Sequence, residues 1–158
     1  MYVKALAVAA MLSGNAAAQD PRGHVDPDNP DQAGFAEYFQ LSPVIRAGDT
    51  VHISGMAAAL PPDTEPSPEA YEAAIRRVFE EIGAGLALAG ADWSDVVDMT
   101  SYHVDMRAHQ DIFLRVRREF ITQQPYAAWT AVGVEQLWVD SLFVEIDVVA
   151  YLGGDNAE

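Results

Sequence analysis

The hydrophobic positions between residues 39 and 152 follow two periods, which predict strands and helices. Segments rich in β-branched and aromatic residues predict strands, and apolar residues spaced by three and four positions predict helices. We expect strands at 44–47, 50–54, 96–104, 128–134 and 142–152, and helices at 67–89 and 108–121. The order is β-β-α-β-α-β-β. It predicts an α+β sheet with both helices on one face.

The first predicted helix has recognisable ends. Ser67 suits the N-cap and Pro68 the first helical position, while Gly90 marks the stop. Its apolar stripe and that of the second helix predict the side that packs on the sheet. The first stripe comprises Tyr71, Ile75, Val78, Ile82, Leu86 and Ala89, and the second Ile112, Val116 and Phe120.

The last predicted strand, LFVEIDVVAYL, carries two acids on one side. Side chains alternate along a strand, so Glu145 and Asp147 point to the same face. The face suited to the helices comprises Leu142, Val144, Ile146, Val148 and Ala150, and the other Phe143, Glu145, Asp147, Val149 and Tyr151. Helices on one side leave the second, mixed face uncovered. We therefore expect it to meet another subunit, with the acids in or beside an inter-subunit cleft.

The N-terminal residues have the layout of a secretory signal peptide. Lys4 precedes a short apolar stretch, and Ala16-Ala17-Ala18 forms a cleavage site, so we expect residues 1–18 to be removed and the protein to be periplasmic or secreted. The alternative is a buried N-terminal helix; the apolar run is too short to span a membrane. We assign 19–38 to a flexible leader rich in Pro, Asp and Gly, 39–153 to one domain, and 154–158 to a tail.

Composition excludes several kinds of chemistry. Lys4 is the only lysine, so the mature chain carries eight arginines against 24 acids, a formal charge of −16. It therefore cannot form a lysine Schiff base, and a nucleic-acid partner is not expected because phosphate binding needs concentrated positive charge. The chain has no cysteine, which excludes disulfides and thiolate chemistry. We expect no cofactor and no membrane partner.

Glu145 is the best candidate for a catalytic group. A carboxylate in a partly apolar cleft can have a raised pKa and deprotonate or orient water; the alternative is a structural acid bonded to backbone N–H groups or to an arginine. The histidines, His52, His103 and His109, lack the spacing of a metal site, so we expect no bound metal. Trp129 could form the floor of a pocket or serve in packing.

Three passages resemble the Rid family (reactive-intermediate deaminases, once labelled L-PSP endoribonucleases or translation inhibitors): SPVIRAGDTVHISG, LALAGADWSDVVDMTSYHVDM and VEIDVVAYL. The resemblance covers residues 39–152. It implies a chorismate-mutase-like fold and a homotrimer whose sheets form a central barrel, with a cleft at each subunit interface. Family members hydrolyse enamines and imines to 2-oxo acids and ammonia. In them an arginine on the strand after the second helix holds the substrate carboxylate, and a glutamate on the last strand helps to place water. Glu145 matches that glutamate.

The chain departs from the family pattern at several positions of the implied site. Trp129, followed by Thr130, aligns with the arginine, and Leu41 stands where deaminating members often have tyrosine. Phe113 lies near a pocket asparagine, whereas Ser42 and Gly55 are retained. Loss of a bidentate contact worth a few kcal/mol would weaken binding of a 2-iminocarboxylate, unless Arg46 or Arg107 reaches the cleft.

Two hypotheses follow for a small-molecule ligand in that cleft. One is a hydrolase acting on an imine, enamine or related compound that lacks a required carboxylate. The other is a non-catalytic trimer that binds an aromatic or apolar ligand. The charge and the signal peptide both oppose the older nuclease label.

Overall fold

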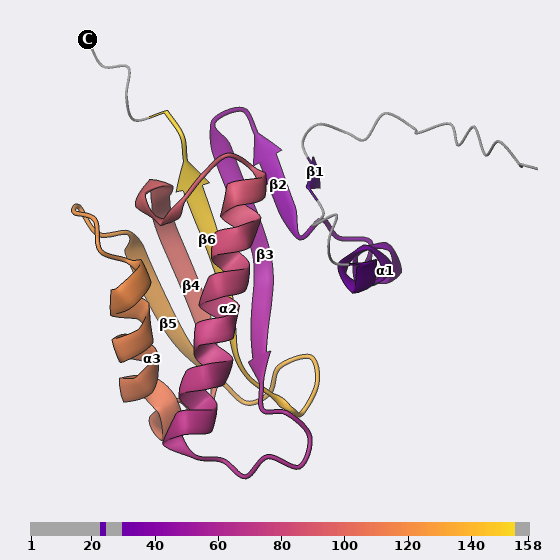
Figure 1. Cartoon of the computed structure of the whole chain (residues 1–158), viewed down its shortest axis with the longest axis vertical. Coiled ribbons are helices and arrows are strands. Elements are labelled where there is room, and N and C mark those ends of the chain that lie inside the picture. The colour runs from indigo at the N-terminus through magenta and orange to yellow at the C-terminus, as the bar shows by residue number, and fades with distance from the viewer. Residues whose placement is uncertain (1–22, 25–29, 154–158) are drawn as a thin grey trace, which may run out of the picture.

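A mixed β-sheet with two long helices on one face forms the body of the protein (Figure 1). The computed structural model describes residues 23–24 and 30–153. Its elements are β1 (Gly23–His24), α1 (Pro30–Phe39), β2 (Val44–Ala47), β3 (Thr50–Ala59), α2 (Pro68–Leu88), the 3₁₀ turn η1 (Trp93–Asp95), β4 (Val96–Val104), α3 (Met106–Phe120), β5 (Ala128–Val134) and β6 (Leu142–Tyr151). From β2 onward the order is β-β-α-β-α-β-β, which confirms the predicted α+β class.

The strands lie in the order β1-β2-β3-β6-β4-β5. All neighbours are antiparallel except β4 and β5, which run parallel. Strand β6 therefore lies between β3 and β4. Residues close to it on both sides come from distant parts of the chain.

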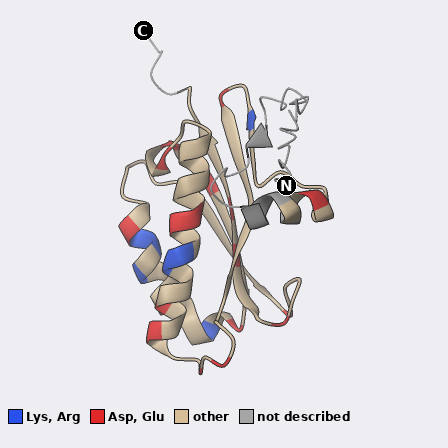
Figure 2. Ribbon diagram, turned by 45° about the vertical axis from the view of Figure 1, so that its right-hand side comes forward, with Lys and Arg blue, Asp and Glu red and all other residues tan. Residues whose placement is uncertain are grey.

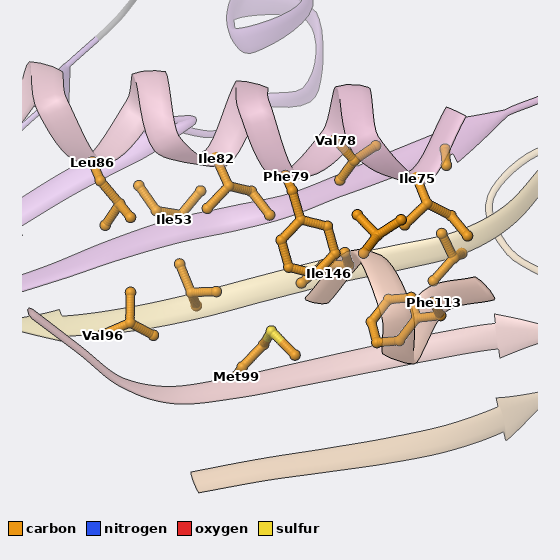
Figure 3. Close-up of a cluster of buried hydrophobic side chains, with 14 of the residues drawn as sticks. Ile53, Ile75, Val78, Phe79, Ile82, Leu86, Val96, Met99, Phe113 and Ile146 are labelled. Carbon is orange, nitrogen blue, oxygen red and sulfur yellow. The ribbon is translucent and has the colours of Figure 1, made fainter. Parts of the chain in front are cut away.

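Helices α2 and α3 bury their apolar sides against the sheet and against each other (Figure 3). Ser67 caps α2 by accepting a hydrogen bond from the N–H of Ala70 at 3.1 Å, and Gly90 follows the helix with φ +79°. A Cβ at Gly85 would lie 3.1 Å from Val44 Cγ2, so glycine lets α2 approach β2 closely. The residues at the centre of the core are Ile53, Ile75, Phe79, Ile82, Leu86, Met99, Phe113 and Ile146.

Four features differ from the sequence-based expectations. Phe143, predicted to share the face of Glu145, is buried against Tyr71 of α2 and His109 of α3, because the pairing of β6 with β3 is irregular at the start of β6. Strand β3 continues to Ala59, because it pairs with β6 beyond a register shift between Ile53 and Met56. Phe79, absent from the predicted stripe, is fully buried, because α2 packs on α3 as well as on the sheet. Residues 30–38, which we assigned to the leader, belong to α1.

The expected signal peptide (1–18) and tail (154–158) lie outside the described residues. No helix within the described residues is long and apolar enough to cross a membrane.

Candidate functional site

A cavity of about 770 Å³ lies beside Glu145 at the end of the sheet where β3 and β6 pair. Helix α1, strands β3 and β6 and the segment before β6 build its walls. The residues lining it are Phe39, Leu41, Ser54, Gly55, Met56, Ala57, Trp138, Val139, Leu142 and Glu145. The fold thus brings together three of the predicted site residues, namely Glu145, Gly55 and Leu41.

The Glu145 carboxylate lies directly against the backbone of Gly55. A Cβ built at Gly55 would collide with Oε1 of Glu145 and lie 2.8 Å from its Cδ. Any side chain at position 55 would therefore displace the acid. The close approach occurs at the register shift of β3, where Ala57 rather than Gly55 pairs with Glu145.

Glu145 is half-buried, and its environment favours the neutral acid. Burial, and secondarily the negative charge of Asp147, raise the pKa of Glu145 above its usual range. Asp147, two residues along the same face, also has a raised pKa, because of burial and then the charge of Asp98. A carboxyl group with a raised pKa beside a largely apolar cavity accepts a proton more readily than an ordinary carboxylate and can return it.

Ser42 contributes to this site through its backbone. Its carbonyl oxygen accepts a hydrogen bond from Ser54 Oγ at 3.0 Å, which ties the segment after α1 to β3. The N–H of Ser54 donates to the carbonyl of Pro43 at 2.9 Å. Leu41 is thereby held at the cavity wall.

Trp129 lies on the opposite face of the sheet, under α3. Its Nε1–H donates to Ser101 Oγ at 2.9 Å, and its ring stacks on Phe113 with centroids 5.8 Å apart. The Glu145 side chain points away from the helices, because its neighbours Val144 and Ile146 are core residues. Within one subunit, Trp129 and Phe113 are therefore separated from Glu145 by the sheet.

The cation beside Trp129 is Arg117, which sequence reasoning did not name. Its guanidinium carbon lies 4.6 Å from the centroid of the indole ring. Arg46, one of the two arginines considered, instead donates to the carbonyls of Gly48 and Ala89, both at 3.0 Å. Thr130 is exposed on the far side of β5 from its neighbour Trp129.

A row of buried, hydrogen-bonded polar side chains was also not predicted from the sequence. His103 Nδ1 lies 3.1 Å from His109 Nε2, and His103 Nε2 lies 2.9 Å from Ser101 Oγ, which also accepts from Trp129. Burial lowers the pKa of His103 to about 4 and lowers that of His109. The sequence contained a sign of this network. Met99, Ser101 and His103 follow one another at two-residue spacing in β4, which places two polar side chains on the same core-facing side as Met99.

The chain shows no metal-binding cluster in its described part: no three His, Asp or Glu residues there are grouped to hold an ion. The two buried histidines are instead bonded to each other and to Ser101.

Comparison with known proteins identifies the family. The profile of the Endoribonuclease L-PSP family matches residues 31–152. The chain belongs to this family. RutC family protein YjgH of Escherichia coli K12 is 34% identical over 116 residues, covering 73% of this chain and 85% of that protein. A solved YjgH structure matches with a TM-score of 0.60 at 32% identity, over 74% of this chain and 87% of that one.

Two further structures extend the likeness. RidA from an Antarctic Psychrobacter species matches with a TM-score of 0.59 at 26% identity, over 84% of this chain and 96% of its own. A Mycobacterium tuberculosis member of the YjgF/YER057c/UK114 family matches with a TM-score of 0.65 at 24% identity, over 82% and 98% of the two chains. The similarity to the Mycobacterium tuberculosis protein shows the fold alone. The Rid-like fold expected from sequence is confirmed.

Proposed function

We propose that the protein is a Rid-type hydrolase of imines, enamines or related small molecules, with Glu145 as the group that activates water. The observation that carries this proposal is a half-buried carboxyl group, with its pKa raised by burial, lying against Gly55 at the wall of a 770 Å³ cavity. Such a group suits proton transfer at a carbon–nitrogen double bond.

The proposed reaction adds water across the C=N bond. Glu145 takes a proton from the attacking water, whose oxygen bonds to the imine carbon. That proton passes to nitrogen and gives a carbinolamine. Its hydroxyl proton then moves to nitrogen as well, the C–N bond breaks, and ammonia leaves as the carbonyl forms. An enamine enters the same sequence after a proton moves to its carbon. The reaction consumes one water and needs no redox partner.

We propose that the active assembly is a homotrimer in which a neighbouring copy completes the cleft. The sheet face away from α2 and α3 supports this, because these two helices leave it uncovered and it carries apolar residues such as Val132 and Tyr151, 36% and 49% exposed. Trp129 lies across the sheet from Glu145 in its own subunit.

We further propose that the substrate needs no carboxylate, and that the reaction takes place in the periplasm or outside the cell. Two observations support the first point. The sequence resemblance aligns Trp129 with the family arginine, and none of the described residues lining the Glu145 cavity is a cation. The second point rests on the signal peptide expected at residues 1–18.

A non-catalytic ligand-binding trimer is the second candidate. The apolar character of the cavity favours it, since Phe39, Met56, Trp138 and Val139 supply much of the wall. Such a protein would hold an aromatic or apolar compound without turning it over.

Glu145→Gln separates the two candidates. For the hydrolase, we expect ammonia release from an imine without a carboxylate to fall by about 100-fold or more, with ligand binding retained. Glu80→Gln, on the exposed side of α2, is the matched control and should keep full activity. Equal behaviour of Glu145→Gln and wild type in every assay would favour the binder. Efficient turnover of 2-iminopropionate would contradict the proposed substrate class.

A further inference from the structure

Arg117, in the last turn of α3, is a partly buried cation that forms no ion pair with an acid among the described residues. Its guanidinium rests on the Trp129 ring at 4.6 Å. Its Nε is buried and has no hydrogen-bond partner within the described part of the chain, and burial lowers its pKa. A buried donor without a partner is costly, so this guanidinium would gain from a nearby acceptor.

The other arginines facing solvent around α2 and α3 are mostly paired. Arg76 bonds Glu72 and Glu119, Arg77 lies 3.7 Å from Glu81, and Arg115 bonds Glu72 at 2.6 Å. Figure 2 shows these positive and negative segments side by side on the two helices.

Arg117 and its neighbour Arg118 are different. Within residues 34–153 neither has an ion pair. In a chain with a net charge of −15, these two adjacent arginines form a local positive site, because the neighbouring Glu119 is paired with Arg76.

Both arginines line one cavity of about 490 Å³ at the end of α3. Ile121, Thr122 and Tyr126 complete its lining, and the Tyr126 ring is 59% exposed. The cavity shares no lining residue with the one beside Glu145. It combines guanidinium donors, a hydroxyl group and an apolar surface.

We propose that this cavity binds a small aromatic carboxylate, with Arg117 and Arg118 holding the carboxylate and Tyr126 and Ile121 contacting the ring. Guanidinium groups pair with carboxylates through charge-assisted hydrogen bonds. The carbonyl end of α3 opposes an anion with only about half an elementary charge, whereas the two arginines supply two full charges. The strongly acidic chain disfavours large polyanions. This inference goes beyond the proposed hydrolase and does not depend on it.

Benzoate and its neutral counterpart benzamide test the site by calorimetry on the full chain. We expect benzoate to bind at least tenfold more tightly than benzamide, a difference of about 1.4 kcal/mol, with an affinity that falls as salt rises. Arg118→Gln, at an exposed position, should weaken benzoate about tenfold. Arg117→Gln should do the same, with its fold checked by circular dichroism. Arg115→Gln is the control and should stay within about twofold of wild type.

Several results would overturn the proposal. They are equal affinity for benzoate and benzamide, no saturable benzoate binding, a loss in Arg115→Gln as large as in Arg118→Gln, and binding of inorganic phosphate without binding of benzoate. A benzoate affinity that changes about tenfold in Glu145→Gln would place the ligand in the other cavity and equally contradict the assignment. If Arg117→Gln fails to fold, the benzoate affinity of Arg118→Gln still tests the proposal.

Discussion

Acid should destabilise the protein through His103 before most carboxylates titrate. The side chain is 2% exposed and its two ring nitrogens face His109 and Ser101. Burial, and secondarily the neighbouring His109, lower the pKa of His103 to about 4 from an ordinary value of 6.5. The native state therefore keeps this imidazole neutral at a pH where the unfolded chain protonates it.

The direction in which pH changes the free energy of unfolding follows from proton linkage. Well above pH 6.5 His103 is neutral in both states and contributes nothing to the pH dependence. As the pH falls from 6.5 toward 4, the unfolded state binds a proton that the native state does not, so the free energy of unfolding decreases. With pKa values of 6.5 and about 4, the loss at pH 5 is about 2 kcal/mol. His109, whose pKa is also lowered by burial, adds to the loss.

Urea unfolding at fixed protein concentration, at pH 7 and pH 5, measures this loss. His103→Gln removes the titrating group and keeps a polar side chain. The variant should be less stable than wild type at pH 7, but should lose about 2 kcal/mol less on going to pH 5. His52→Gln, at an exposed position on β3, is the matched control and should follow wild type.

An equal decrease in the free energy of unfolding from pH 7 to pH 5 for wild type and His103→Gln would refute this reasoning. So would a His103 pKa near 6.5 measured by NMR in the folded protein. Either result would mean that the buried chain of Ser101, His103 and His109 stabilises the charged imidazole.

Two further substitutions test the site and its surroundings. Gly55→Ala should abolish turnover and cost about 1–3 kcal/mol of unfolding free energy, because the added Cβ collides with the Glu145 carboxylate; Gly133→Ala, whose Cβ meets nothing within 4 Å, is the control, and equal effects of the two would contradict the argument. Trp129→Phe keeps an aromatic ring against Phe113 but loses the indole N–H donated to Ser101. It should cost about 1 kcal/mol in thermal unfolding, and an unchanged melting temperature would show that this hydrogen bond contributes nothing.

Much of the fold could be predicted from local patterns. Strands β4 and β5 occupy the predicted ranges, and α2 begins after Ser67 and ends before Gly90 as expected. Capping residues and hydrophobic periods act within a few residues, so they can be identified in the sequence. The α1 helix was missed because its residues, rich in Pro, Asp and Gly at the start, show only weak amphipathic character.

The candidate site was predictable only in part. Glu145, Gly55 and Leu41 meet in one cavity. Phe39 and Trp138, whose ring centroids lie 5.7 Å apart, also line it but were not predicted to do so. Their approach depends on α1 and on the segment before β6, which are nearly 100 residues apart in the sequence. No local pattern reports such a contact.

The sequence by itself determined the order of strands and helices from β2 onward, most of the buried residues of α2 and α3, and the presence of two acids on one face of β6, because these follow from short-range periodicity. Only the tertiary structure decided where the polar and charged groups meet. The parallel pairing of β5 with β4 turns Trp129 toward α3, beside Ser101 and under Arg117, and away from Glu145. That choice rests on register and packing between distant segments, which set the face of each side chain only when the sheet is complete.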